Sequence, residues 1–286
     1  MEILDIFSEL DGLAVVPAAR LFLHEAHDPA RLERLKRRLA SEGTQANPII
    51  ASRIGYSNSR FVSTGDPEGF LVLDGAHRAE ALRSLGCRLA LVQLVELPIA
   101  AQGWQHLVKL GISGPGEIPV RLEEIIGCGV KPLFTLDHKE KARVVAEIET
   151  SGGDGFGVIP ASEGTTAMAE TLWRIQEAYP SGSGEDGVVR RLAPFEKVEP
   201  GAGEVVIAYR SFPTAGIIEE ISAGRTLPAG VTRFTVPGRI LGVGMPLELL
   251  TRGDEPEAAR WLEDTVARHL RENRIRRYDE PVTLFE

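Results

Sequence analysis

The sequence predicts a mixed α/β (α+β) fold in which an N-terminal unit, residues 1–100, precedes a second region, residues 101–286. Two observations predict this class. Short apolar runs alternate with segments of helical period, and glycine or proline separates one segment from the next. The composition, 43% hydrophobic and 26% charged, is that of a globular protein rather than a disordered one.

The first predicted helix begins at Asp28-Pro29, where Asp28 can cap the helix and proline suits the first turn. Leucines at 32, 35 and 39 recur at helical spacing, and Gly43 ends the helix. The apolar run 47–51 predicts a buried strand, and the polar stretch 52–69 a hairpin or loop.

The run 70–73 predicts a strand that leads directly into Asp74-Gly75-Ala76-His77-Arg78 and a helix over 79–85, which Gly86 ends. Residues 89–97 predict another apolar strand. These segments form a compact unit of the usual size for a domain.

In the second region, the sequence predicts helices and strands separated by polar, glycine-rich loops. We expect helices at 118–126, 139–150, 168–178 and 256–272, strands at 205–209, 231–236 and 240–243, and loops at 151–157 and 180–187. Asp254 and Glu257 resemble a capping box for the last helix. The 151–157 loop has no following lysine and serine or threonine, so we interpret it as a mobile loop and candidate lid rather than a P-loop.

The composition and the net charge argue against several classes of binding partner. The net charge of −9, without a basic block, argues against binding along a nucleic-acid duplex. No apolar run approaches a membrane span, and the acidic start lacks the pattern of a signal peptide. The two cysteines, Cys87 and Cys128, are in no CxxC pair, so we expect buried thiols rather than zinc or a disulfide. A cytoplasmic location is expected.

The strand–Asp74-Gly75-Ala76-His77-Arg78–helix segment is the strongest chemical signal. The first turn of a helix has unpaired N–H groups and a partial positive charge, which attract anions. Gly75 permits close backbone approach, and His77 and Arg78 add donors. Asp74 could hold magnesium or orient a hydroxyl group. An ordinary turn with a capping aspartate remains the alternative on spacing alone.

A family resemblance adds to this pattern. Leu23-His24-Glu25, Asn47-Pro48-Ile49-Ile50 and the segment 71–82 follow one another in an order that resembles the core of the ParB/sulfiredoxin superfamily. Within it, the chain resembles the free serine kinases. The segments 232–234, 237–239 and 277–282 are similar to C-terminal signatures of that group, whereas 131–203 matches least.

The resemblance implies a nucleotide-binding ParB/sulfiredoxin-like core followed by a mixed α/β substrate-binding and closing region. It also implies a phosphotransferase that makes O-phospho-L-serine from free L-serine, with ATP or ADP as the donor and Mg²⁺ as the metal. Glu25 would take the proton of the serine hydroxyl, which is a weak nucleophile at neutral pH. Asp74 would contact magnesium or the hydroxyl group. Gly75, Ala76, His77 and Arg78 would surround the phosphates.

The residues that the resemblance implies for the serine pocket come from the middle and the end of the sequence. Trp104 would form its wall, Thr232 would add a hydroxyl group, and Arg233 or Arg239 would bind the carboxylate through the planar guanidinium group. We expect His24, next to the base, to be a surface imidazole.

Two departures from the family pattern leave alternatives open. Ala76 replaces a histidine of the usual Asp-Gly-His-His-Arg motif, and Phe234 stands where a histidine is common. Ala76 also stands where sulfiredoxins have their nucleophilic cysteine, which excludes that chemistry. A non-catalytic, ParB-like transcriptional regulator that senses a nucleotide and binds a ligand or DNA without turnover is one alternative. A kinase for another small alcohol is a second. The sequence does not distinguish ADP from ATP, the oligomeric state or the pathway served.

Overall fold

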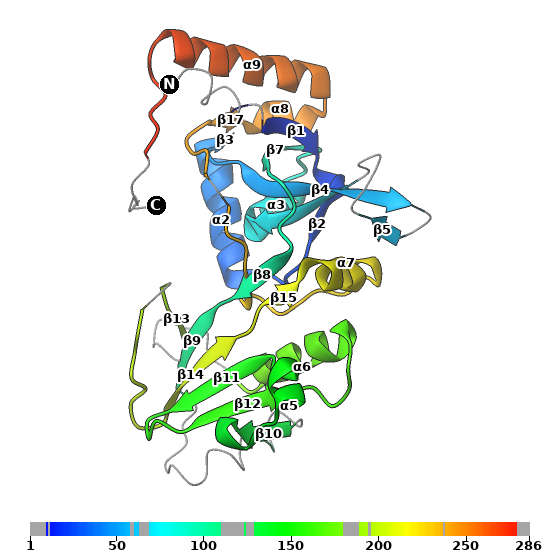
Figure 1. The fold of residues 1–286 in the computed structure, drawn as a ribbon. Coiled ribbons are helices and arrows are strands. Elements are labelled where there is room, and N and C mark those ends of the chain that lie inside the picture. Colours follow the sequence, from blue (N-terminus) through cyan, green and yellow to red (C-terminus); the bar gives the residue numbers. More distant parts are fainter. Residues whose placement is uncertain are drawn as a thin grey trace.

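The computed structural model describes residues 10, 12–57, 60–62, 69–109, 123, 129–179, 189–193, 196–236 and 238–278. Two units, each built on a sheet, lie one above the other in Figure 1, with helix α7 (Thr214–Ser222) between them. The mixed α/β class is therefore confirmed. None of the helices in the described ranges is both long and apolar enough to cross a bilayer.

The first unit contains a mixed sheet with the strand order β1-β7-β4-β6-β2, and β5 pairs with β4. Its strands are β1 (Leu13–Pro17), β2 (Leu21–Leu23), β4 (Ile49–Ser57), β5 (Arg60–Val62), β6 (Gly69–Asp74) and β7 (Leu89–Leu94). The parallel pairs β4–β7 and β2–β6 alternate with antiparallel pairs. The strand predicted at 70–73 is confirmed, whereas the strands predicted at 47–51 and 89–97 form over 49–57 and 89–94.

Helices α2 (Pro29–Glu42) and α3 (Ala76–Ser84) pack against one face of this sheet, and the other face belongs to a second core that includes residues of the second unit. The side chain of Asp28 accepts from the N–H of Arg31, and Gly43 ends α2 in the left-handed conformation with φ of 65°. Both signals that the sequence offered for α2 are therefore correct. Helix α3 begins directly after Gly75, three residues earlier than the predicted 79–85.

The second unit is an antiparallel sheet with the strand order β10-β12-β11-β14-β9-β13. Its strands are β9 (Gln105–Lys109), β10 (Gly129–Pro132), β11 (Ala146–Thr150), β12 (Gly155–Ile159), β13 (Val189–Arg191) and β14 (Glu204–Tyr209). Helix α6 (Thr165–Glu177) confirms the prediction for 168–178 and contributes to the core with Leu172 and Ile175. Strand β14 confirms the prediction for 205–209.

Two predictions in this unit were wrong. The helix predicted at 139–150 is a short helix, α5 (His138–Arg143), followed by strand β11. The side chains at 146, 148 and 150 are buried and those between them are more exposed, which is the period of a strand rather than a helix. The glycine-rich segment 151–157 is not a lid. It forms the turn between β11 and β12 and the beginning of β12, because these two strands pair as a hairpin.

The predictions for the C-terminal third of the chain are confirmed only in part. The strand predicted at 231–236 is limited to β16 (Thr232–Arg233), and no strand forms at 240–243. The last helix, α9 (Glu255–Arg271), is confirmed, and the Asp254 side chain accepts from the N–H of Glu257. The predicted helix at 118–126 and loop at 180–187 fall outside the described residues, apart from Glu123.

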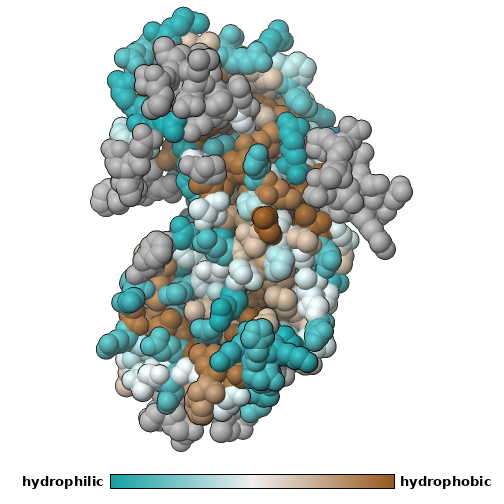
Figure 2. Space-filling model, in the orientation of Figure 1, coloured by the Kyte–Doolittle hydropathy of each residue, from teal (hydrophilic) through white to brown (hydrophobic). Residues whose placement is uncertain are grey.

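The two units are joined at a waist. Strand β8 (Ala100–Gly103) pairs with both β15 (Phe212–Pro213) and β16, and β8 continues into β9 of the second sheet. A Cβ atom at Gly103 would lie 1.8 Å from the carbonyl oxygen of Tyr209, so only glycine fits at this crossing. Figure 2 shows hydrophobic residues at the waist, whereas hydrophilic residues cover much of both ends.

The chain finally returns to the first unit. Strand β17 (Met245–Pro246) pairs with β3 (Thr44–Gln45), and helices α8 (Leu247–Arg252) and α9 pack on the edge formed by β7 and β1. The buried Met245, Leu250 and Leu262 belong to the same core as α2 and α3. Figure 1 shows α9 across the end of the molecule farthest from the second sheet. The boundary at residue 100 stays a prediction.

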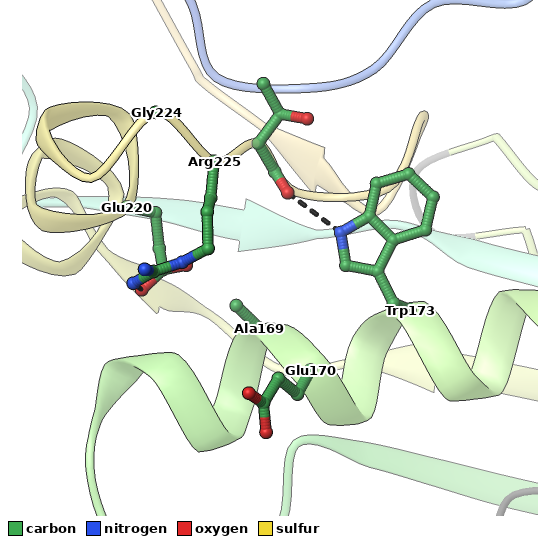
Figure 3. A pocket seen from close by; sticks show the side chains of 7 residues that line it. Ala169, Glu170, Trp173, Glu220, Gly224 and Arg225 are labelled. Carbon is green, nitrogen blue, oxygen red and sulfur yellow. Dashed lines mark hydrogen bonds and ion pairs between the residues drawn. The ribbon is translucent and has the colours of Figure 1, made fainter.

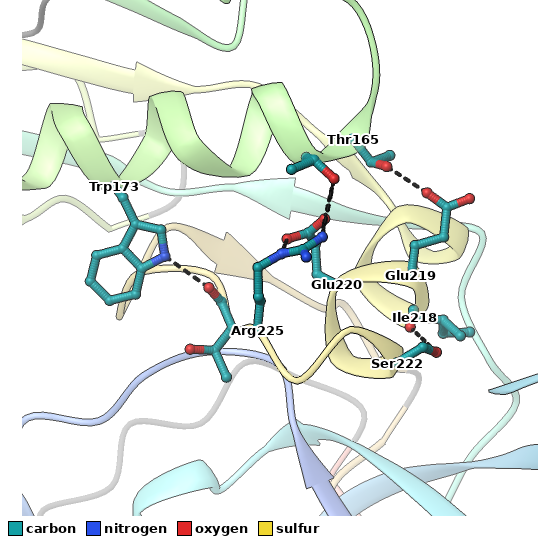
Figure 4. Close-up of polar contacts among 9 residues, drawn as sticks. Thr165, Trp173, Ile218, Glu219, Glu220, Ser222 and Arg225 are labelled. Carbon is teal, nitrogen blue, oxygen red and sulfur yellow. Dashed lines mark hydrogen bonds and ion pairs between the residues drawn. The ribbon is translucent and has the colours of Figure 1, made fainter. Parts of the chain in front are cut away.

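A polar junction ties α6 to α7. Glu220, only 2% exposed, forms an ion pair with Arg225 and accepts a hydrogen bond from Thr166 of α6. The indole N–H of Trp173 donates to the carbonyl oxygen of Thr226 at 2.8 Å (Figure 4). These groups line a small pocket of about 280 Å³ (Figure 3). Because Glu220, Arg225 and the Trp173 N–H bind one another or the backbone, we interpret the pocket as structural.

A buried hydrogen-bonded chain supports the loop at 229–230 from the second unit. His106 Nδ1 contacts the hydroxyl of Tyr179 at 2.9 Å, which contacts the hydroxyl of Tyr209 at 2.5 Å. His106 also hydrogen-bonds the backbone of Gly230. Gln176 donates to the carbonyl oxygen of Ala229 at 2.7 Å. The second unit thereby fixes a loop that borders the first.

Because His106 is buried in this hydrogen-bonded network, we expect the stability of the protein to depend on pH. Burial, and next the charge of Arg191, lower the pKa of His106 from 6.5 to about 4. Between these values the unfolded state binds more protons than the folded state, so the free energy of unfolding rises with pH. Urea unfolding at pH 7.5 and 5 should show that His106→Gln removes about 2 kcal/mol of that difference. His138→Gln, at an exposed position, is the control. An unchanged pH dependence in His106→Gln would contradict this origin.

Candidate active site

A large cavity lies between the two units and has a volume of about 1230 Å³. All ten residues that the sequence singled out line it: Glu25, Asp74, Gly75, Ala76, His77, Arg78, Trp104, Thr232, Arg233 and Arg239. They come from segments up to about 200 positions apart in the chain. The cavity exceeds the usual range for a small-ligand site, so it has room for two ligands together.

The N-terminus of α3 opens into this cavity. Strand β6 ends at Asp74, and Gly75 turns the chain with φ of 94°, a conformation that side-chain-bearing residues rarely adopt. The first backbone bond of the helix runs from the N–H of Ala79 to the carbonyl oxygen of Gly75. The N–H groups of Ala76 and His77 precede this bond, in the first turn of the helix, where backbone N–H groups commonly bind an anion.

His77 and Arg78 line the cavity at the N-terminus of α3 and also form hydrogen bonds with neighbouring segments. His77 Nε2 accepts from the backbone N–H of Asp28 at 3.0 Å, so only Nδ1 can donate to a ligand. Burial, and next the charge of Arg31, lower the pKa of His77 to about 4, which keeps the ring neutral at physiological pH. Arg78 donates to the carbonyl oxygen of Pro48 at 2.7 Å. Both side chains thus hold α3 against neighbouring segments.

Asp74 is ion-paired with Arg239 at the edge of the cavity. Burial acts to raise the pKa of Asp74, but the hydrogen bond and charge of Arg239 outweigh it and lower the pKa. The carboxylate is therefore ionised at neutral pH. Arg239, which the sequence analysis names with Arg233 as a candidate for a substrate carboxylate, contacts the carboxylate of Asp74 in this structure.

Glu25 is held by backbone N–H groups at the cavity wall. Its Oε2 accepts from the N–H of Gly230 at 2.8 Å, and its Oε1 accepts from the N–H of Thr232 at 2.6 Å. The Thr232 hydroxyl also donates to Oε1, at 2.5 Å. Next to this contact the backbone forms a parallel bridge between Glu25 and Leu227. The carboxylate thus has a fixed orientation at the cavity wall.

His24 is not the surface imidazole that the sequence suggested. It is only 5% exposed and lies between the carbonyl oxygen of Val72 and the hydroxyl of Thr232, each at 2.8 Å. Phe234 packs against its ring edge-on, with 5.3 Å between the centroids. The prediction failed because the burying residues lie about 50 and 210 positions farther along the chain.

Two arginines stack on Trp104. The guanidinium carbons of Arg191 and Arg233 lie 4.7 Å and 5.1 Å from the centre of the indole ring. A Cβ atom at Gly230 would lie 2.0 Å from Arg191 Nη2, so a glycine there gives this arginine room. Sequence reasoning missed Arg191, which lies on the short edge strand β13 and in no recognisable motif.

Cations predominate around the cavity, although the chain as a whole is acidic. Among the residues that the structure describes, seven arginines line it, against the carboxylates of Glu25, Asp28 and Asp74. The arginines are Arg31, Arg34, Arg38, Arg78, Arg191, Arg233 and Arg239. Such a local excess of positive charge favours an anionic ligand.

Comparisons with known proteins show which sequences and structures this chain resembles. No family model matches the sequence. The chain is 26% identical, over 277 residues, to the ATP-dependent L-serine kinase SbnI of Staphylococcus aureus (strain NCTC 8325 / PS 47). That alignment covers 96% of this chain and 98% of the kinase.

Solved structures show the same fold. The structure of SbnI with a C-terminal truncation superposes with a TM-score of 0.70 at 23% identity, covering 92% of this chain and 98% of that one. A free serine kinase variant in complex with AMP gives a TM-score of 0.59 at 14% identity, covering 84% and 93% of the two chains. The chain therefore shares its fold with solved serine kinases and resembles one of them in sequence over almost its whole length.

Proposed function

We propose that this protein is a kinase that transfers a phosphoryl group from ATP or ADP to the hydroxyl of free L-serine, giving O-phospho-L-serine. One observation carries the proposal: the fixed carboxylate of Glu25 and the open N-terminus of α3 line the same cavity. Phosphoryl transfer requires a positioned acceptor alcohol, a group that takes its proton and neutralisation of the phosphate charge. The similarity to an ATP-dependent L-serine kinase supports the proposal and makes ATP the first donor to test.

The nucleotide phosphates would bind at the N-terminus of α3. The backbone N–H groups of Ala76, His77 and Arg78 point from the first turn, where the helix dipole favours negative charge. Alanine at position 76 removes a side-chain donor but keeps the backbone donor. Arginines around the cavity would neutralise the remaining phosphate charge.

Magnesium would bind at Asp74. Mg²⁺ is commonly held by one or two carboxylates together with phosphate oxygens and water. Asp74 fits that pattern as an ionised carboxylate two residues before the first N–H group of the proposed phosphate site. When bound, the ion would neutralise charge on the transferring phosphoryl group. The Arg239 side chain that pairs with Asp74 would orient the carboxylate.

Glu25 would take the proton of the serine hydroxyl. An ionised carboxylate has about four acceptor positions, and the contacts with Gly230 and Thr232 occupy three. The remaining position would receive the alcohol. A carboxylate whose orientation is already fixed needs no reorganisation when it acts as a base.

The serine carboxylate would bind between Arg191 and Arg233. Both guanidinium groups are stacked on Trp104, which restricts their orientation. A preorganised guanidinium group loses less conformational entropy when it forms paired hydrogen bonds with a carboxylate. Arg191 thus takes the role that the sequence assigned to Arg233 or Arg239, in partnership with Arg233.

The first test is phosphoserine formation by wild type and Glu25→Gln, with L-serine, Mg²⁺ and either ATP or ADP. We expect wild type to form O-phospho-L-serine and the variant to lose about 10²- to 10⁴-fold in kcat, because the amide cannot take the proton. Calorimetric titration with nucleotide should give a similar Kd for both proteins, which would show that the variant is folded. Nucleotide binding by wild type without product would contradict the proposal and favour a ligand-sensing role.

Arg191→Met should raise the KM for serine about 10- to 100-fold, because a charge-assisted contact with the substrate is lost. The KM for the nucleotide should change little. Arg190→Met is the matched control: Arg190 is the preceding residue of β13, and it pairs with Glu196 instead of lining the cavity. Equal effects of the two variants on the KM for serine would rule out a specific role for Arg191.

Asp74→Asn should raise the Mg²⁺ concentration that gives half-maximal activity by about tenfold or more, because the carboxylate is replaced by a weaker ligand. The measurement is a Mg²⁺ titration at saturating serine and nucleotide. Arg239→Gln removes the same ion pair but keeps the carboxylate. If both variants show the same Mg²⁺ dependence, the importance of Asp74 lies in the ion pair and not in the metal.

A further inference from the structure

Gln93 has a buried side-chain amide to which the proposed function assigns no role. It lies on β7 and is only 7% exposed. Its Nε2 donates to the carbonyl oxygen of Gly238 at 3.1 Å, and its Oε1 accepts from the N–H of Ile240 at 3.0 Å. A single amide therefore binds the backbone on both sides of Arg239.

These two bonds hold the segment 238–242 as a neighbouring strand would. A side-chain amide carries a donor and an acceptor, like a peptide group, so it can replace a strand as the partner of an extended backbone. This is consistent with the absence of a strand at 240–243, where the apolar sequence predicted one. Farther along, the N–H of Gly242 donates to Asn47 Oδ1 at 2.9 Å. Side chains of the first unit thus fix this segment at two points.

Gln93 and Asp74 lie in one row across the first sheet. Ile50 of β4 pairs with Gln93 of β7 on one side and with Asp74 of β6 on the other. Neighbouring strands are about 4.8 Å apart, so these two residues are separated by about 10 Å. Arg239 spans the row, because its backbone is held at Gln93 while its guanidinium group pairs with Asp74.

The ion pair between Arg239 and Asp74 depends on such support because it is half exposed. Their side chains are 48% and 47% exposed. At this exposure water screens the attraction, and ordering a long arginine side chain costs conformational entropy, so a pair without support contributes little to stability. A backbone that is already fixed at position 239 reduces the freedom that the side chain loses. The contacts of Gln93 therefore favour the paired state before any ligand binds.

We propose that Gln93 is a positioning residue that fixes Arg239 and, through it, the carboxylate of Asp74. This inference rests on the proposed kinase function, in which Asp74 holds Mg²⁺. Gln93 is not among the described residues that line the cavity, so it acts only through Arg239. Its loss should weaken metal binding and leave the affinity for serine nearly unchanged.

The first test is hydrogen exchange of the Ile240 amide in the free protein, measured by NMR. Wild type should protect this amide, because Gln93 accepts its hydrogen. Gln93→Met keeps an unbranched side chain of similar size but has no donor and only a weak acceptor, so exchange should become at least about tenfold faster. Ser52→Ala is the control. It removes another buried hydrogen bond of this sheet, to the carbonyl oxygen of Val95 at 2.9 Å, and should leave the exchange of Ile240 unchanged.

The second test is the affinity for Mn²⁺, which binds carboxylate ligands as Mg²⁺ does and is detected by electron paramagnetic resonance. With a non-hydrolysable ATP analogue present, Gln93→Met and Arg239→Gln should each weaken Mn²⁺ binding about two- to fivefold. Because both changes act through the Asp74 carboxylate, the double variant should bind Mn²⁺ no more weakly than the weaker-binding single variant. In turnover assays, the KM for serine should stay within about twofold of wild type.

Three results would overturn the inference: rapid exchange of Ile240 in wild type, unchanged Mn²⁺ affinity in Gln93→Met, or losses that multiply in the double variant. An equal loss of Mn²⁺ affinity in Ser52→Ala would also overturn it, because that result indicates a general loosening of the sheet. Failure of the kinase proposal is distinguishable, because wild type would then form no phosphoserine, whereas the exchange of Ile240 does not depend on turnover.

Discussion

The arrangement of the site depends on the contact between the Glu25 carboxylate and the backbone N–H groups of Gly230 and Thr232. This contact joins Glu25 to a segment about 200 residues later in the chain, and it fixes the carboxylate for which we propose a role in proton transfer. Charge-assisted hydrogen bonds to backbone N–H groups are among the stronger polar contacts in proteins. They orient the carboxylate before any ligand binds.

Residues of the second unit hold the backbone segment that makes this contact. Gln176 and His106 hold the backbone at 229 and 230, and Arg191 passes over Gly230 to reach Trp104. The same few residues thus form the back of the Glu25 site and the edge of the proposed serine site. A change in the packing of α6 or β9 would therefore affect both. The first unit supplies the N-terminus of α3, Asp74 and Glu25 itself, so residues of both units line the cavity.

Local signals predicted much of the fold and of the site. The N-cap at Asp28, the glycines at 43 and 75 and the apolar runs of β4, β6 and β7 act over a few residues, so the sequence shows them directly. The ten predicted site residues were found through such motifs and through the family resemblance, and all of them line one cavity. The roles assigned to them stay predictions. The segment 139–150 was mistaken for a helix because its charged side chains suit a helix as well as an exposed strand face.

Tertiary contacts explain what the sequence did not reveal. His24 is buried because Val72 and Thr232 meet around it, and Arg191 enters the site from an edge strand without a motif. Arg239 pairs with Asp74 across 165 positions of sequence. None of these pairings leaves a periodic or local pattern, so only the folded chain shows them.

A crystal structure with a non-hydrolysable ATP analogue, Mg²⁺ and L-serine would test the central claim most directly. The account predicts the terminal phosphate at the N–H groups of 76–78 and the serine hydroxyl within hydrogen-bonding distance of Glu25, at about 2.6–3.2 Å. The serine carboxylate should lie at Arg191 and Arg233. A serine bound away from Glu25, or phosphates bound away from α3, would contradict it.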